Sequence, residues 1–161
     1  MMLTFQAAFE EEIDLIYQLY RRCVLTSRGS WDDEYPTRDF VEQDYLRQGL
    51  MTLKNEQGEI VAAGAITPAD ELEDLEYHTT LLHPLELSRL AVDPKFQGRG
   101  YGKLLLQGLI EEVRKRGVDG IQLLAAKENA PALALYRGAD FQEKGSCRMY
   151  DTDFILFEKK L

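Results

Sequence analysis

The sequence predicts a mixed α/β fold, in which a central, mixed and twisted sheet of about six or seven strands carries helices on both faces. In the first half of the chain, two helical patterns precede an apolar hairpin. In the second half, apolar strands and helices alternate, which is typical of a sheet with parallel neighbours. A length of 161 residues suits one domain, so we expect residues 1–161 to form a single folding unit.

The elements of the first half follow from the spacing of apolar side chains. Apolar residues recur at helical spacing over about 10–24 and predict an amphipathic helix. A second helix is expected over about 37–48, because Gly49 provides a stop signal. The runs 50–54 and 59–66 flank a short polar turn and predict a β-hairpin.

The second half alternates between strands and helices until two closing strands. We expect strands at about 85–92 and 120–126, helices at 101–116 and 131–137, and closing strands at 141–150 and 154–159. The longer helix places Leu105, Leu109 and Val113 on one face and ends before Gly117.

A glycine-rich turn joins the strand over 85–92 to the helix that follows. Its letters are Gln97-Gly98-Arg99-Gly100-Tyr101-Gly102-Lys103. Glycines let backbone N–H groups approach an anion without an intervening Cβ, and a helix start adds unpaired N–H groups and a positive dipole end. The pattern therefore predicts a cradle for a pyrophosphate, with a ligand-free turn as the alternative. A Walker loop would need Gly at 97, and a dinucleotide fingerprint would need Gly at 103.

A second motif lies one helix and one strand further along, from Asn129 to Phe141, with Tyr136 within it. Together with the Gln-x-x-Gly-x-Gly loop behind Glu-Leu-Ser-Arg-Leu-Ala-Val, this Asn-x-x-Ala-x-x-Leu-Tyr segment resembles the GNAT superfamily of acyl-CoA-dependent N-acyltransferases, over about 86–161. The one departure is Asp140, where the family has Gly. Because Asp is among the few residues that visit positive φ, we expect a positive φ there.

The resemblance implies a GNAT fold in which the parallel strands over 85–92 and 120–126 splay apart. The pantetheine arm of acetyl-CoA or coenzyme A then lies between them and bonds to their backbone, much as an added strand would. The cofactor-binding residues expected on this basis are Leu90, Ala91, Val92, Gln97, Gly98, Arg99, Gly100, Tyr101, Gly102, Lys103, Asn129 and Tyr136. Asn129 is also a natural helix cap.

Acyl transfer from a thioester to an amine needs a neutral amine, a polarised carbonyl and a proton for the leaving thiolate. Glu86, at the start of the motif strand, is the candidate general base, with ordered water as the alternative. The resemblance directs the hydroxyl of Tyr136 at the coenzyme A sulfur, as a proton donor or a hydrogen-bond donor; core packing is the other interpretation. The N–H of Val92 is the candidate polariser of the thioester oxygen.

The acceptor site is expected between the two leading helices, where the resemblance places the border of the acceptor pocket. Trp31 and Tyr35 are the candidate substrate-binding residues, because aromatic rings can cover an apolar part of a substrate while the neighbouring carboxylates hold a cation. An equally open interpretation is that Trp31 only fixes this loop to the core.

Composition restricts the classes of partner. A formal net charge of -9 disfavours a nucleic-acid partner, yet residues 94–110 carry three cations and no carboxylate, as a highly anionic cofactor would favour. The acidic run over 70–76 is interpreted as solvated surface, with attraction of an amine as the alternative. Cys23 and Cys147 have no metal-ligand spacing, so no metal is expected. With no apolar run long enough to span a membrane and no leader pattern, we expect a cytoplasmic protein.

The sequence thus predicts an N-acetyltransferase that moves an acetyl group from acetyl-CoA to a primary amine of a small molecule or peptide. Direct attack in a ternary complex is expected, because no cysteine lies in a motif for an acyl-enzyme. The alternative is a non-catalytic acyl-CoA-binding regulatory module, and a homodimer is left open. A nucleotide hydrolase is disfavoured by the failed Walker spacing.

Overall fold

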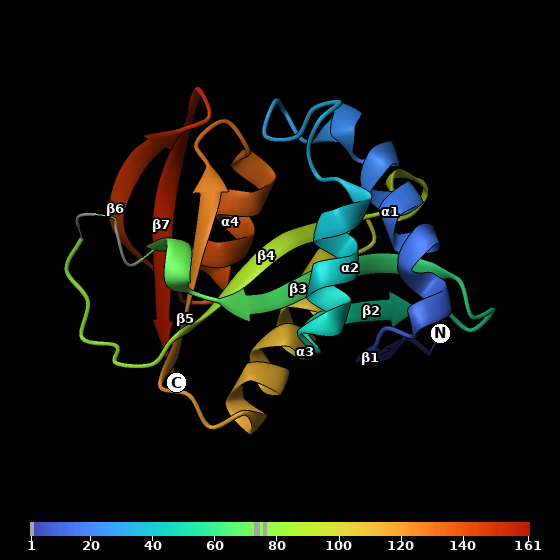
Figure 1. The fold of residues 1–161 in the computed structure, drawn as a ribbon, viewed down its shortest axis with the longest axis horizontal. Coiled ribbons are helices and arrows are strands. Elements are labelled where there is room, and N and C mark those ends of the chain that lie inside the picture. The colour runs from blue at the N-terminus through green and yellow to red at the C-terminus, as the bar shows by residue number, and fades with distance from the viewer. Residues whose placement is uncertain (1, 73–74, 76) are drawn as a thin grey trace.

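A computed structural model describes residues 2–72, 75 and 77–161, apart from the side chain of Glu71 (Figure 1). The described strands form one seven-stranded sheet in the order β1-β2-β3-β4-β5-β7-β6. Its strands are β1 (Thr4–Ala7), β2 (Leu50–Lys54), β3 (Ile60–Pro68), β4 (Leu85–Val92), β5 (Gly120–Ala126), β6 (Gln142–Met149) and β7 (Thr152–Lys160). Every neighbouring pair is antiparallel except β4 and β5, which are parallel.

Helices cover both faces of the sheet and enclose two cores. The helices are α1 (Ile13–Arg22), α2 (Arg38–Leu46), α3 (Tyr101–Lys115) and α4 (Ala130–Gly138). On one face, α3 and α4 share a large apolar core with β2 to β5 and β7. On the other face, α1 and α2 lie over β2 and β3 and enclose a smaller core (Figure 1). The expected mixed α/β sheet with helices on both faces is confirmed.

The strand β1 was not expected from the sequence. Four residues are too few for an alternating pattern to stand out, and β1 forms by pairing along the edge strand β2. Its Phe5 fills the space left by a glycine on α3: a Cβ added at Gly108 would lie 2.4 Å from the ring of Phe5. Gly108, a small residue in the middle of α3, is therefore the feature of the sequence that reflects the presence of β1.

The parallel pair separates after a short contact. β4 and β5 are in register only at Leu85–Ile121 and Glu86–Gln122. Beyond these pairs β4 stays with β3 as far as Val92, while β5 stays with β7 as far as Ala126. The expected splay is therefore present.

A bulge in β4 lies within the splayed part. Ala65 of β3 pairs with Ser88 and Ala63 pairs with Ala91, so Arg89 and Leu90 together stand opposite Gly64. Arg89 has a φ of 54°, in the left-handed region that a non-glycine residue seldom adopts. The bulge turns successive side chains, so that Leu90 joins the core under α3 and Ala91 the core under α1.

A long segment joins β3 to β4, and its described part from Thr79 to His83 is bound to the part of the sheet that carries β5 and β7. Asp119 accepts hydrogen bonds from the N–H groups of Leu82 (2.6 Å) and His83 (2.9 Å), and Thr79 Oγ1 donates to buried Glu158 at 2.5 Å. These bonds fasten the end of the segment across β5 and β7. Much of the acidic run over 70–76 (Glu73, Asp74 and Glu76) lies outside the described residues.

Candidate active site

A small apolar cavity lies in the gap between α3 and α4, beside the splayed part of β4. It measures about 80 Å³ and is lined by residues from three elements. These are Leu90, Ala91 and Val92 of β4, Gly102 and Leu105 of α3, and Ala132, Leu135 and Tyr136 of α4. The two sequence motifs, far apart in the chain, thus form opposite walls of one slot. A thin acyl chain entering it would run along the freed edge of β4.

The glycine loop opens at the mouth of this slot. Gly98 has a φ of 80° and Gly100, the N-cap of α3, has a φ of 81°. A Cβ added at either glycine would have no described atom within 4 Å, so glycine is needed here for its positive φ and not for lack of room. The absence of a Cβ also leaves the space before the helix start open. The first N–H groups of any helix lack partners inside that helix. The loop is therefore shaped to hold an anion by its backbone.

Of three side chains in and after the loop, one is buried and two are exposed. Tyr101 is buried and packs near Phe96, with ring centroids 6.4 Å apart. The exposed Arg99 guanidinium lies 5.4 Å from the centroid of the same Phe96 ring. Lys103 is exposed on the first turn of α3. Two cations therefore stay at the surface beside the helix start, where they favour a negatively charged ligand.

Gln97 turns back toward the strand. Its Nε2 donates to the backbone oxygen of Val92 at 3.2 Å, and Cys23 Sγ donates to the same oxygen at 3.3 Å. The side chain of Gln97 thus fixes the end of β4, and what it offers to a ligand is its backbone. This orientation was not foreseen from the motif.

Asp93 secures the same strand end. It is 1% exposed and accepts hydrogen bonds from Arg22 Nη2 (2.7 Å) and the N–H of Lys95 (3.1 Å). Burial alone would raise the pKa of Asp93, but these two partners outweigh burial and hold the pKa below its usual value. The carboxylate is therefore charged at neutral pH and fixes the entry to the loop.

Tyr136 forms the α4 wall of the slot. Its ring packs against Phe141 and Phe157, with centroids 5.8 and 5.7 Å away, and burial raises its pKa to about 12. A thiol titrates near ~8.5, so full proton transfer from this phenol to a thiolate is uphill by several pKa units. The raised pKa therefore suits Tyr136 to a hydrogen bond with a developing thiolate better than to delivery of the proton.

Asn129 and Asp140 fix the two ends of α4. Asn129 Oδ1 accepts a hydrogen bond from the N–H of Ala132 at 3.3 Å, so the expected helix cap is present. Asp140 has a φ of 66°, which confirms the positive φ expected where it replaces glycine.

Glu86 lies on the opposite face of the sheet from Tyr136. Its neighbours Leu85 and Leu87 belong to the core under α3, so alternation turns Glu86 toward the α1 and α2 face. It is half-buried and belongs to the last residue pair before the strands part. The carboxylate of Glu86 and the phenol of Tyr136 thus lie on opposite sides of the split. This is the arrangement that a base for the amine and a hydrogen-bond donor to the thiolate would need.

The loop between α1 and α2 forms a wall on the Glu86 face. Trp31 and Tyr35 are both half-buried, and edge contacts link them to Tyr20 and Phe40. Trp31 lies 5.2 Å, between ring centroids, from Tyr20 of the core, so it anchors the loop. Tyr35 OH accepts a hydrogen bond from Arg89 Nη1 at 3.0 Å, which joins the loop to β4.

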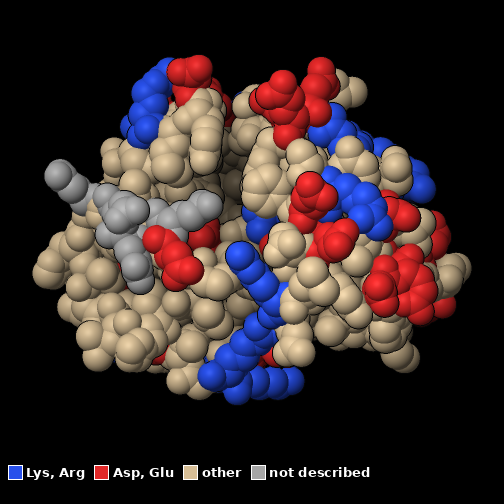
Figure 2. Space-filling view, in the orientation of Figure 1, with Lys and Arg blue, Asp and Glu red and all other residues tan. Residues whose placement is uncertain are grey.

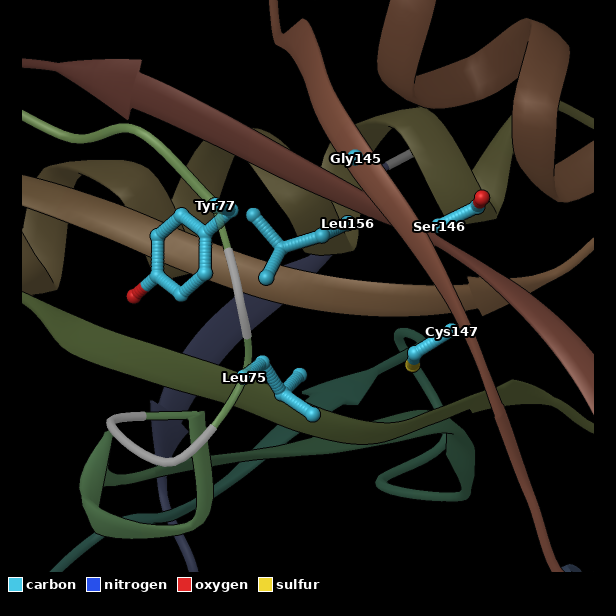
Figure 3. Close-up of a pocket in the computed structure, with 6 residues that line it drawn as sticks. All are labelled: Leu75, Tyr77, Gly145, Ser146, Cys147 and Leu156. Atoms are coloured by element: carbon cyan, nitrogen blue, oxygen red, sulfur yellow. The ribbon is translucent and has the colours of Figure 1, made fainter.

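This face is hollowed. Figure 2 shows a depression between the half of the molecule that carries β5 to β7 and the half that carries α1 and α2. A cavity of about 280 Å³ lies on the same face of the sheet, lined by Leu75, Tyr77, Gly145, Ser146, Cys147 and Leu156. Leu75, Tyr77 and Leu156 gather around it while the hydroxyl of Ser146 points away (Figure 3). An acceptor would approach from this side, across the sheet from the slot.

The thiol of Cys23 lies near the site but is not set up as a nucleophile. Burial and the neighbouring Asp93 raise its pKa to about 12, so it stays protonated at neutral pH. We expect Cys23→Ala to keep kcat within about threefold, because direct transfer needs no acyl-cysteine. Initial rates test this, together with the intact mass of the protein after incubation with acetyl-CoA alone. An acetyl adduct on the wild-type chain that disappears in Cys23→Ala would contradict it.

No helix of the described residues is both long and apolar enough to cross a membrane. Among the same residues, no group of three or more His, Cys, Asp or Glu side chains could hold a metal ion.

Comparison with known proteins identifies the fold and the family. A family model described as the acetyltransferase (GNAT) family matches residues 13–141. The [ribosomal protein bS18]-alanine N-acetyltransferase of Salmonella typhimurium is 36% identical over 99 residues, which are 62% of this chain and 67% of that protein.

Solved structures agree in fold. A GNAT-family acetyltransferase from Streptococcus agalactiae superposes with a TM-score of 0.81 at 22% identity, covering 99% of this chain and 95% of that one. The structure of yncA from Salmonella typhimurium with its cofactor acetyl-CoA superposes with a TM-score of 0.77 at 20% identity, covering 100% and 95%.

Proposed function

This chain belongs to the acetyltransferase (GNAT) family, and we propose that it acetylates the α-amino group at the N-terminus of a protein acceptor. It is an N-acetyltransferase, and nothing found supports a non-catalytic acyl-CoA-binding module. A protein acceptor is supported by the relatives that match over about 99 residues, which are named as alanine N-acetyltransferases of ribosomal protein bS18. The observation that carries the proposal is the split between β4 and β5, with a slot and a glycine loop on one face and a hollow on the other.

Acetyl-CoA is the acyl donor. We assign its pyrophosphate to the glycine loop and its pantetheine arm to the slot. The pyrophosphate lies on the backbone N–H groups of 97–102, next to the exposed Arg99 and Lys103. The pantetheine arm would be held along the freed edge of β4 from Leu90 to Val92, in the slot lined by Tyr136, with Asn129 at the start of α4 as a further proposed contact. This arrangement brings the thioester next to Tyr136, at the gap between β4 and β5 that connects the two faces of the sheet.

The transfer is a direct attack. The amine enters from the hollow and loses a proton to Glu86, directly or through water, as its nitrogen bonds to the thioester carbon. The carbonyl oxygen is polarised by the N–H of Val92 while the carbon–sulfur bond breaks. The thiolate accepts a hydrogen bond from Tyr136 and takes its proton from the solvent or from the amine by way of Glu86.

The acceptor class can be tested with a small panel. We would compare a hexapeptide that begins with alanine, the same peptide with a blocked N-terminus and a free lysine side chain, and the polyamine spermidine. Thiol release from acetyl-CoA is the readout. Turnover is expected with the free N-terminus and not with the blocked peptide. Turnover of spermidine alone would assign a small-molecule acceptor instead.

The role of Glu86 predicts a pH-dependent defect in Glu86→Gln. An α-amino group has a pKa near ~7.7–8.0, so below this pH most of the acceptor is protonated and depends on a base. The variant should therefore lose most rate at acid pH and recover as the pH rises past the pKa of the amine. A pH–rate profile that runs parallel to the wild-type profile would remove Glu86 from the proton path and leave ordered water in its place.

Residues 1–161 are proposed to form one acetyltransferase domain that works in the cytoplasm.

A further inference from the structure

We propose that Arg89 is a positioning residue. It fixes the acceptor wall, which is the loop between α1 and α2 that holds Trp31 and Tyr35, to β4, the strand beside which the thioester of acetyl-CoA would lie. This inference rests on the proposed function, because it assigns a role within the acceptor site. Arg89 lies in the motif strand Glu-Leu-Ser-Arg-Leu-Ala-Val but is not among the site residues expected from the sequence. Its role follows from three contacts that meet at the bulge of β4.

The first step is the position of the bulge. Arg89 lies between Glu86, where β4 makes its last pair with β5, and Val92 at the end of the slot. Its positive φ of 54° and the single residue opposite it, Gly64, set the local direction of the strand. A non-glycine residue keeps such a conformation only where its surroundings hold it. The course of β4 between base and thioester therefore depends on what holds Arg89.

The second step is the set of partners. Nε and Nη2 of Arg89 donate to the two oxygens of Asp44, at 2.8 and 2.6 Å, and the guanidinium lies 5.0 Å from the ring centroid of Phe40. Asp44, on α2, is 1% exposed, and the side chain of Arg89 is 10% exposed. Such a forked pair fixes direction as well as distance.

The third step links this pair to the acceptor. The remaining described bond of Arg89 runs from Nη1 to Tyr35 OH in the loop between α1 and α2. It occupies a lone pair of the Tyr35 oxygen and leaves the O–H proton for donation to a backbone carbonyl of a peptide acceptor. Arg89 thereby holds the Tyr35 hydroxyl, α2 and the bulge in one fixed relation.

A purely stabilising role would not require this chemistry. Replacing a buried ion pair by apolar residues is often neutral or stabilising, so net stability does not by itself account for this pair. The exposed pairs Arg38–Asp14 and Arg21–Asp33 also tie α1 to the segments that follow it, but they do not reach β4. Only the buried pair among these connects the acceptor wall to the strand.

The test replaces both charges together, so that no unpaired charge is buried. We expect the double variant Asp44→Leu/Arg89→Met to melt at or above the wild-type temperature. Its kcat/KM for the alanine-initial hexapeptide should fall at least about tenfold, while the dissociation constant of acetyl-CoA changes by less than about threefold. Arg38→Lys, on the exposed pair, is the matched control and should keep wild-type kinetics.

A second measurement tests the link to Tyr35. Tyr35→Phe should lower kcat/KM in the wild-type background and cost nothing more in the double variant, because without Arg89 the Tyr35 hydroxyl is no longer held toward the acceptor. If the folded double variant has wild-type kcat/KM, or if Tyr35→Phe costs the same in both backgrounds, the inference is wrong. Failure of the wild-type chain to turn over the hexapeptide would instead overturn the proposed acceptor, and the inference with it.

Discussion

Gly100→Val should remove acetyl-CoA binding from a protein that still folds. The φ of 81° at Gly100 is one that a β-branched residue adopts only at a cost of roughly 1–2 kcal/mol. No described atom lies within 4 Å of the added Cβ, so the new side chain enters open space before α3 instead of the core. This is the space assigned to the pyrophosphate. We expect the dissociation constant of acetyl-CoA, measured by calorimetry, to rise about a hundredfold or more.

Gly117→Val is the matched control. Gly117 follows the other end of the same helix, has a φ of 75° and is equally open around its Cβ. The two variants should lose similar thermal stability, since they carry the same backbone penalty. Only Gly100→Val should lose the cofactor. Equal loss of affinity in both variants would mean that the effect is destabilisation, and wild-type affinity in Gly100→Val would place the pyrophosphate elsewhere.

Tyr136→Phe should slow the transfer step while leaving the cofactor bound. The phenylalanine keeps the ring contacts with Phe141 and Phe157, so the walls of the slot survive. What is lost is the hydroxyl that stabilises the thiolate, and we expect kcat to fall by about 10²-fold. Tyr17→Phe, a half-buried tyrosine on α1, serves as the control for removal of a hydroxyl. An undiminished kcat in Tyr136→Phe would reduce this residue to packing.

The pH dependence of the same variant separates the two roles of Tyr136. Its pKa of about 12 keeps the phenol protonated throughout an assay between about pH 6 and 10. The ratio of wild-type to variant kcat should therefore stay constant over that range. A ratio that falls toward pH 10 would indicate a phenol with a lowered pKa, able to deliver its proton.

Local pattern was sufficient for most of the fold and for the backbone conformations of the glycine loop and of the two ends of α4. Strand and helix positions follow from side-chain periodicity, and the conformations of Gly100, Asn129 and Asp140 follow from what each residue type does at a helix end. These features depend on neighbours in sequence. The motif strand β4 and the helix α3 begin at the residues where the pattern predicts them.

The features that sequence reasoning missed are long-range. Asp44 and Arg89 are 45 residues apart, and nothing near either residue indicates that a buried ion pair forms between them. The side chain of Gln97 satisfies a backbone oxygen of β4, which the motif alone cannot distinguish from a contact with a ligand. Tyr77 lines the larger cavity, and nearby Thr79 is bound to Glu158 of β7, a contact between residues 79 positions apart.

The most direct test of the account is to follow where the acetyl group goes. Wild-type protein, acetyl-CoA and the alanine-initial hexapeptide would be incubated together, and the peptide sequenced by tandem mass spectrometry while released thiol is measured. We predict one acetyl group on the α-nitrogen of the peptide for each thiol released, and neither product with Gly100→Val. Thiol release without acetylated peptide, or acetylation that persists in Gly100→Val, would contradict an acetyltransferase that holds its donor on this loop.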